Sequence, residues 1–294
     1  MNIVIGIPAY NEEKNIASII VKLKKIANTI IICDDGSTDT TADIARGLGA
    51  IVISHSKNQG YGEAIKTIFL EAKNKQVDIL VTFDADGQHQ IKDISKVIEP
   101  INLGNADVVI GSRFLDDKTK IPGYRKMGIK VITQLTNITT GSNITDSQSG
   151  FRAYSKLALE KIIPTESGMG ISTEILIKVQ EEKLRITEVP IKISYEGSTS
   201  THNPVSHGTS VIFSTLKFVA IKHPLTFYGI PGMILLGIGL IFTAWTINIF
   251  STQGEFITNI AIVGGGSLVI GIMLLITASI LFSVVSTINE KNKS

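Results

Sequence analysis

Two long apolar runs near the C-terminus constrain the fold of this 294-residue chain most strongly. Leu225 to Phe250 and Ile257 to Ile288 contain no Asp, Glu, Lys or Arg. Each run exceeds the roughly 20 residues that a helix needs to cross about 30 Å of hydrocarbon. A pair of buried core helices is the alternative, but uncharged runs of this length are rare in soluble proteins. The sequence therefore predicts a hairpin of two transmembrane helices, over residues 225–250 and 257–288.

Basic residues flank this hairpin on one side only. Lys217 and Lys222 precede the first run, Lys291 and Lys293 follow the second, and the connecting segment STQGEFITN contains no Lys or Arg. Because basic residues are enriched in cytoplasmic flanks, both termini are predicted to face the cytoplasm, together with everything before the first span. We therefore expect a multi-pass protein of the cell membrane, or of an endoplasmic-reticulum-type membrane.

Composition bears on the partners of the chain and on its compartment. The formal net charge is only +2, so the charge balance gives no reason to propose a nucleic acid partner. Cys33 is the only cysteine, so no intrachain disulfide can form, which suits a reducing compartment. A homo-oligomer is compatible with the sequence, which does not decide the oligomeric state.

The first 110 residues alternate short β-branched runs with helix-like segments. Strands are predicted over residues 3–7, 29–33, 50–54, 78–83 and 106–110. Helices are predicted between them, over residues 14–26, 40–48, 62–72 and 91–98. This alternation indicates an α/β domain with a mainly parallel sheet covered on both faces. In such sheets ligands bind beyond the carboxyl ends of the strands.

The segment from residue 114 to residue 224 is less regular. Its predicted elements are helices over 125–136, 156–162 and 172–183 and a strand over 186–195. A polar loop is expected at 196–208, and the segment 210–222 suits either a helix in the membrane interface or a core-facing helix. The expected organisation is an α/β domain over 1–200, a loop with a juxtamembrane helix over 201–224, and the two spans.

Oxygen-bearing side chains follow the fourth predicted strand. Asp84 and Asp86 are separated by one residue, and Gln88 comes two positions later. Such ligands suit Mg²⁺ or Mn²⁺, which usually shares its coordination with water and phosphate oxygens. Acidic residues after a strand also cap helices, so this group alone is not specific.

Three more motifs are expected near the same edge of the sheet. In PAYNEE, Tyr10 is suited to stack on a base, and in DDGSTD, Asp34 or Asp35 can accept hydrogen bonds from base or ribose donors. Asp39 is equally explained as the N-cap of the helix that follows. NQGYGEA resembles a phosphate-cradling glycine turn, but Ile65 replaces its third glycine, so we interpret it as a tight turn into a helix.

Taken in order, PAYNEE, DDGSTD, NQGYGEA, DADGQH, GSR and DSQSGFR resemble the family 2 glycosyltransferases, in particular the dolichyl-phosphate mannose and polyprenyl-phosphate glucose synthases. The resemblance covers residues 2 to about 195. It implies a GT-A fold, which is a Rossmann-like α/β domain. It also implies a nucleotide-diphosphate sugar donor, a divalent cation, Mg²⁺ or Mn²⁺, and inversion at the anomeric carbon.

The resemblance also implies roles for individual positions. Those matching nucleotide-binding positions are Pro8, Tyr10, Asn11, Glu12, Asp34, Asp35 and Asp84. Those matching the metal-binding segment are Asp84, Asp86 and Gln88. Those expected at the acceptor phosphate, a group that guanidinium recognises well, are Arg113, Arg125 and Arg152. Those expected to be catalytic are Asp86, Arg113, Arg125 and Asp146. For Arg113 the alternative is a structural salt bridge at a strand end.

One loop departs from the family pattern. Many mannose synthases have a basic residue in an R-x-x-G-x-S-K type loop after the last strand, whereas this chain has YEGSTSTHNPVSHG. His202 or His207 could contact the diphosphate there, or could simply be solvated. The departure leaves the identity of the donor open.

The chemistry of the acceptor can be inferred from what the motifs lack. An alcohol acceptor requires a carboxylate base, whereas a phosphate monoester, with a second pKa of about 6, is already an oxyanion at neutral pH. The Glu-Asp and Q-x-x-R-W signatures of polysaccharide-building members are missing, and the only tryptophan, Trp245, lies in the first apolar run.

We therefore expect a membrane-anchored enzyme that moves a hexose from GDP-mannose, UDP-glucose or UDP-N-acetylglucosamine to dolichyl or polyprenyl phosphate. The alternatives are transfer to another membrane acceptor, such as a lipid-linked oligosaccharide, and an inactive nucleotide-sugar-binding scaffold.

Overall fold

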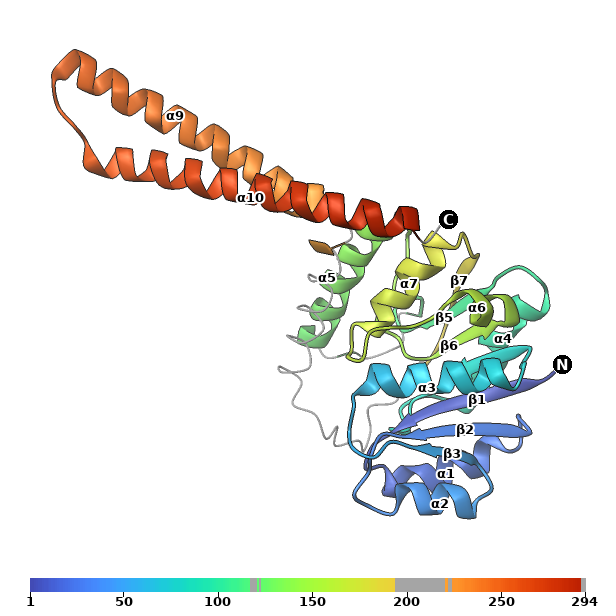
Figure 1. Ribbon diagram of the computed structural model, residues 1–294. Helices are drawn as coiled ribbons and strands as arrows, with labels where there is room; N and C mark the ends of the chain where they lie inside the picture. The colour runs from blue at the N-terminus through green and yellow to red at the C-terminus, as the bar shows by residue number, and fades with distance from the viewer. Residues whose placement is uncertain (117–120, 122, 194–219, 222–223, 292–294) are drawn as a thin grey trace. The chain divides into compact units, whose positions relative to one another are not determined.

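The computed structural model describes residues 1–116, 121, 123–193, 220–221 and 224–291 (Figure 1). The chain divides into two compact units, Met1–Thr215 and Leu216–Ser294. The predicted loop at 196–208, with His202 and His207, lies outside the described residues, as does nearly all of the predicted juxtamembrane helix at 210–222. These expectations stay predictions.

The first unit contains a seven-stranded sheet in the order β3-β2-β1-β4-β6-β5-β7. The strands are β1 (Ile3–Ala9), β2 (Thr29–Asp34), β3 (Ile51–Ser54), β4 (Ile79–Thr82), β5 (Val108–Ser112), β6 (Arg152–Ser155) and β7 (Ile186–Pro190). All neighbours pair in parallel except β6, which is antiparallel to both β4 and β5. The predicted mainly parallel sheet is therefore confirmed, whereas β6 was not predicted.

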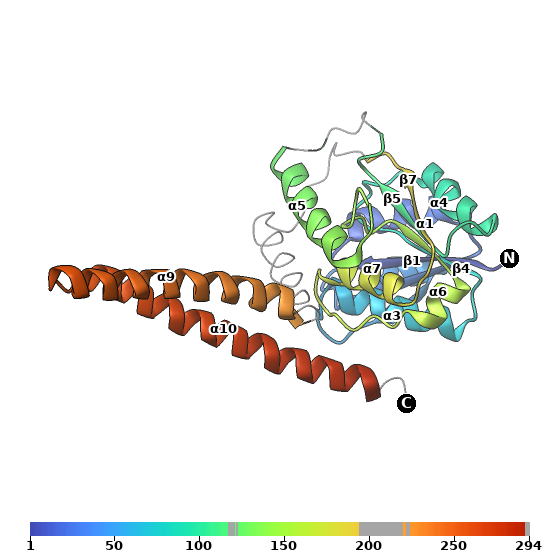
Figure 2. The same ribbon diagram turned by 90° about the horizontal axis from the view of Figure 1, so that it is seen from above.

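Helices cover both faces of this sheet (Figure 2). They are α1 (Glu13–Leu23), α2 (Thr41–Gly47), α3 (Tyr61–Asn74), α4 (Ile94–Asn102), α5 (Gly123–Thr140), α6 (Lys156–Lys161) and α7 (Ile171–Glu181), with a 3₁₀ turn, η1 (Ile91–Asp93), before α4. Side chains of one strand alternate between the faces, so that in β1 Ile5 belongs to the core cluster that contains side chains of α1 and α4, while Val4 belongs to the cluster that contains side chains of α3 and α7. Strands buried on both faces read as continuous apolar runs, which is why the sequence identified them.

The last strand ends earlier than its sequence predicts. A strand over 186–195 was expected, but β7 ends at Pro190, a residue with no backbone N–H for a ladder. Beyond it, Ile193 forms an isolated antiparallel bridge with His89. The chain thus turns from the sheet toward the segment that follows β4.

Strand β6 brings the DSQSGFR motif to the ligand-binding edge of the sheet. Arg152, its first residue, pairs with Thr82 at the end of β4 and with Ile110 in β5. Because β6 is antiparallel, the residues that precede it lie at the carboxyl ends of its parallel neighbours. Thr82 Oγ1 fixes this approach by donating a 2.6 Å hydrogen bond to the carbonyl of Gly150.

The turn into α3 depends on two glycines. Gly60 has a positive φ of 102°. A Cβ at Gly62 would lie 2.4 Å from the carbonyl oxygen of Glu166 and 2.6 Å from that of Gly168. The interpretation of NQGYGEA as a tight turn is therefore confirmed, and its glycines allow close approach of the loop before α7.

Gly62→Ala is expected to lower the free energy of unfolding by about 1–3 kcal/mol, because the new methyl group would meet backbone atoms that cannot rotate away. Gly47→Ala is the matched control, since a Cβ at Gly47 meets no heavy atom within 4 Å. Denaturant unfolding of the detergent-solubilised protein, followed by circular dichroism, gives both values. Equal stability of the two variants would contradict this explanation of the turn.

The second unit is a helical hairpin. A π-helical turn, η2 (Leu225–Gly229), leads into α9 (Ile230–Gln253), and α10 (Thr258–Lys291) follows. The helical stretches Leu225–Gln253 and Thr258–Thr287 are long and apolar enough to cross a membrane. Glycines let the helices approach closely: a Cβ at Gly239 would lie 2.7 Å from the backbone nitrogen of Leu268. The two predicted apolar helices are confirmed, and the second extends beyond residue 288.

Candidate active site

Carboxylates from the loops after β1, β2 and β4 gather at the carboxyl edge of the sheet. Their charges act on the pKa of Glu12. Burial raises this pKa, and the negative charges of Asp86, Asp39 and Asp84 raise it further, against a hydrogen bond from Asn15 that lowers it. Because β1 and β4 are parallel neighbours, the predicted nucleotide residue Glu12 and the predicted metal ligands Asp84 and Asp86 follow strand ends at the same edge of the sheet.

Asp84 is held from two sides. Its Oδ1 accepts a hydrogen bond from the hydroxyl of Tyr61 at 3.3 Å, and its Oδ2 lies 3.1 Å from Nε2 of His89. Burial alone would raise the pKa of Asp84, but the His89 hydrogen bond, the charges of His89 and Arg113 and the Tyr61 hydrogen bond together lower it. The carboxylate is thus ionised at neutral pH and fixed in direction, with 27% of the side chain exposed.

His89 received no role from the sequence, although it directly follows Gln88 in DADGQH. Its side chain is only 5% exposed. The ring packs against Phe83 and Phe151 with centroid separations of 5.6 and 5.1 Å. Its Nδ1 has no hydrogen-bond partner within the part of the chain that the structure describes. The available signal was its position in the motif, but its partner could not be read from sequence.

The donor set fits a divalent cation that arrives with a diphosphate. Among the described residues no group of three or more His, Cys, Asp or Glu side chains could hold a metal alone. Asp86 Oδ1 accepts the backbone N–H of Gln88 at 3.0 Å, across a turn that contains Gly87 with a φ of +73°. One or two carboxylates completed by phosphate and water are what Mg²⁺ usually uses. Asp86 and Gln88, beside Asp84, would hold such an ion.

Asp35 binds the backbone of the turn before α3. Its Oδ1 lies 2.7 Å from Nδ1 of His55 and accepts the N–H of Gln59 at 2.9 Å, while Oδ2 accepts the N–H of Gly60 at 2.8 Å. These contacts occupy both oxygens of a nearly fully buried side chain. The role predicted for Asp35 in nucleotide binding stays a prediction.

The other predicted nucleotide residues tie the loops after β1 and β2 together. Asn11, in the left-handed region with φ of 55°, donates its N–H to Ser37 Oγ and accepts the N–H of Thr38 on its Oδ1, both at 2.9 Å. Asp34 Oδ1 accepts the N–H of Ser37 at 3.2 Å. Pro8 is buried in β1, and Tyr10, which follows that strand, is half-buried.

Asp39 caps two helices. Its Oδ1 accepts the N–H of Thr41, the first residue of α2, at 3.0 Å, and its Oδ2 accepts the N–H of Glu13, the first residue of α1, at 3.2 Å. The interpretation of this residue as a helix cap is therefore confirmed. Asp39 lies one position before the N-cap residue of α2.

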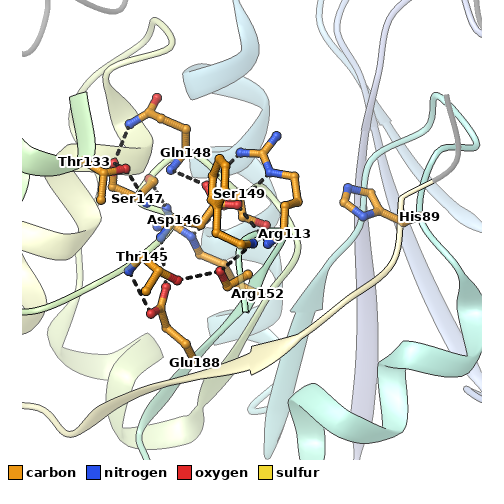
Figure 3. A network of polar contacts seen from close by, with 12 residues as sticks. His89, Arg113, Thr133, Thr145, Asp146, Ser147, Gln148, Ser149, Arg152 and Glu188 are labelled. Carbon is orange, nitrogen blue, oxygen red and sulfur yellow. Dashed lines mark hydrogen bonds and ion pairs between the residues drawn. The ribbon is translucent and has the colours of Figure 1, made fainter. Parts of the chain in front are cut away.

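A second polar network lies at the ends of β5 and β6 (Figure 3). Arg113, which follows β5, donates from Nε and Nη2 to the two carboxylate oxygens of Asp146 at 2.6 and 2.7 Å. Asp146 is fully buried, whereas the Arg113 side chain is 13% exposed. The structure thus shows the salt bridge that was the alternative for Arg113, and it brings two predicted catalytic residues together.

Arg152 lies inside the protein with 1% exposure. It donates to the carbonyls of Ser149, Ser172 and Ser147 at 2.8, 3.1 and 2.7 Å. These contacts favour a structural role, joining the loop before β6 to α7, over the predicted contact with acceptor phosphate. Arg125 belongs to α5, but its side chain is not among those the structure describes, so its predicted role stays untested.

Glu188 in β7 is a further residue that sequence reasoning missed. Its Oε2 accepts the N–H of Thr145 at 2.8 Å and its Oε1 that of Asp146 at 3.0 Å. Burial raises the pKa of Glu188, although these backbone hydrogen bonds lower it. The sequence does show a single acidic residue within the strand ITEVP. Its hydrogen-bond partners lie 43 and 42 positions away, so its role could not be predicted from the sequence.

Comparison with known proteins identifies the family. The model of glycosyl transferase family 2 matches residues 4–163, which is more than half of the chain. The chain belongs to glycosyltransferase family 2. This member is similar to a UDP-N-acetylglucosamine–dolichyl-phosphate N-acetylglucosaminyltransferase of Methanococcus voltae, at 38% identity over 70% of this chain and 89% of that protein. It is also similar to a dolichyl-phosphate hexose transferase of Haloferax volcanii, at 31% identity over 71% of this chain and 90% of that protein.

The fold resembles solved glycosyltransferases. Glucosyl-3-phosphoglycerate synthase from Mycobacterium tuberculosis, in complex with Mn²⁺, UDP-glucose and phosphoglyceric acid, matches with a TM-score of 0.60. The match has 22% sequence identity and covers 74% of this chain and 79% of that one. At this identity the likeness concerns the fold, and it confirms the expected GT-A architecture.

Proposed function

We propose that this glycosyltransferase moves a sugar from a nucleotide-diphosphate sugar to dolichyl or polyprenyl phosphate, with inversion at the anomeric carbon. Two relatives, each aligned with about 70% of this chain, are named for transfer to dolichyl phosphate. The main structural support is that the loop that pairs with Arg113 through Asp146 lies against the acidic edge, since a Cβ at Gly150 of that loop would lie 2.8 Å from Oδ1 of Asp84. A cationic group beside the proposed donor site is suited to align an anionic acceptor.

The mechanism assigns separate tasks to the two networks. Asp84, fixed by Tyr61 and His89, presents a charged and oriented carboxylate to the donor. A divalent cation, when bound by Asp86 and Gln88, supplies positive charge that stabilises the departing nucleoside diphosphate. Arg113 orients the lipid phosphate, whose oxyanion attacks without a protein base.

The donor is the part of the proposal that most needs experiment, because the two relatives are named for different sugars. We expect one of GDP-mannose, UDP-glucose and UDP-N-acetylglucosamine to be used at least about 10²-fold faster than the others, since buried polar groups discriminate strongly between hydroxyl patterns. The assay measures nucleoside diphosphate released by the purified full-length protein with Mn²⁺ and polyprenyl phosphate. Release that does not depend on the lipid would contradict the proposal.

Topology is a separate prediction. We propose that the catalytic unit and both termini are cytoplasmic and that the loop between α9 and α10 is on the far side, as the distribution of basic residues predicts. The native Cys33 is fully buried, and burial raises its pKa to about 12, so it is expected not to react with thiol reagents. In this background Thr252→Cys, in the last turn of α9 beside that loop, should be labelled from outside intact cells, and Ser294→Cys only after permeabilisation. The reverse pattern would exclude this orientation.

A further inference from the structure

The Glu188 carboxylate holds a loop rather than a ligand. Glu188 lies opposite Ile110 in the parallel pairing of β7 with β5. Its two oxygens accept the N–H groups of two consecutive residues, Thr145 and Asp146. Only a carboxylate offers an acceptor to each N–H, since glutamine would place its own donor NH₂ against one of them.

The geometry points to Glu188 as a positioning residue: we propose that it fixes the backbone at Thr145 and Asp146, so that the Asp146 carboxylate directs the Arg113 guanidinium toward the acceptor phosphate. The part that concerns the acceptor rests on the proposed function. The part that concerns the loop and Arg113 does not.

Asp146 is the link between Glu188 and Arg113. Besides Nε and Nη2 of Arg113, its oxygens accept the backbone N–H of Arg113 at 3.1 Å and that of Gln148 at 3.3 Å. A fully buried carboxylate with this many donors has little freedom to turn. The position of this carboxylate therefore depends on the position of the Asp146 backbone, whose N–H is bound by Glu188.

A second contact fixes the same loop from β5. The hydroxyl groups of Ser112 and Thr145 lie 2.6 Å apart, so the strand that ends at Arg113 also grips the loop through a side chain. Figure 3 shows Glu188, Thr145, Asp146 and Arg113 as one connected series. Loosening the Glu188 end leaves the Ser112 contact in place, so the expected defect is misdirection of Arg113 rather than loss of the fold.

The matched control lies at the other end of the paired strands β5 and β7. Asp107, just before β5, accepts the backbone N–H of Arg185 at 2.8 Å and pairs with its guanidinium. Asp107→Asn therefore also removes a carboxylate that joins backbone segments, but far along the strands from the site. Glu188→Gln and Asp107→Asn can be compared in the full-length protein.

The kinetic test measures both substrates. For Glu188→Gln we expect the KM for polyprenyl phosphate to rise about tenfold, with the KM for donor within about twofold of wild type. Asp107→Asn should change neither KM. In an Arg113→Ala/Asp146→Asn background, Glu188→Gln should have no further effect on acceptor KM, because the pathway is already broken. Equal effects on both substrates, or additive effects in that background, would overturn the proposal.

Hydrogen exchange tests the loop without activity. At least one of the amides of Thr145 and Asp146 should exchange about tenfold or more faster in Glu188→Gln than in wild type or Asp107→Asn, since glutamine keeps one acceptor oxygen and places its NH₂ group against the other N–H. Unchanged exchange would refute the positioning role. If exchange accelerates as expected but wild type does not use polyprenyl phosphate, then the positioning role holds and the proposed acceptor is wrong.

Discussion

Asp86→Asn is expected to reduce turnover by about 10²–10³-fold, because it removes charge from the side chain assigned to the cation that stabilises the leaving diphosphate. The fold should be retained, since asparagine is close in size to aspartate and its amide oxygen can also accept the N–H of Gln88. Turnover is measured with saturating donor and acceptor over a range of Mn²⁺ concentrations.

The control for this variant is Asp43→Asn. Asp43 is 82% exposed and, among the residues that the structure describes, pairs at the surface with Arg46, so its loss should leave turnover unchanged. Near-normal turnover of Asp86→Asn at every Mn²⁺ concentration would rule out the assignment of Asp86.

Arg113→Ala is expected to have the largest effect on stability, about 3–5 kcal/mol, because it leaves the fully buried Asp146 carboxylate without its cation. The double variant Arg113→Ala/Asp146→Asn should recover much of this loss, since no buried charge is then unpaired. Thermal unfolding of the three proteins in detergent measures the recovery. Equal destabilisation in the single and double variants would contradict the account of this pair.

The double variant also separates stability from substrate binding. Its affinity for nucleotide, measured by calorimetry, should stay close to that of wild type, whereas its KM for polyprenyl phosphate should rise by about tenfold or more. A fall in nucleotide affinity with unchanged acceptor KM would place Arg113 at the donor instead.

The larger pattern of the fold was predictable because it depends on local sequence. Apolar runs of four to seven residues and amphipathic segments marked the strands and helices of the first half, and two uncharged runs marked the hairpin. Strand β6 was missed because RAYS is short and lacks an apolar pattern. Its place between β4 and β5 is decided by pairing with Thr82 and Ile110, which are distant in sequence.

The motifs at the strand ends were predictable for the same reason, whereas their partners were not. Asp84 follows a strand, but Tyr61, its hydrogen-bond donor, is 23 positions away. Arg152 looks like a phosphate ligand in SGFR, and only the folded loop shows that its donors meet carbonyl groups. Chemistry read from a motif therefore needs the long-range contacts before roles can be assigned.

The most direct test of the central claim is the structure of the lipid product. Purified protein is incubated with polyprenyl phosphate, Mn²⁺ and the preferred nucleotide-sugar, and the lipid is fragmented in a mass spectrometer. The account predicts a single sugar joined to the lipid through one phosphate, seen as a sugar-phosphate fragment, and no product from polyprenol, which lacks the phosphate. Sugar attached to polyprenol, or only to a lipid-linked oligosaccharide supplied in parallel, would contradict it.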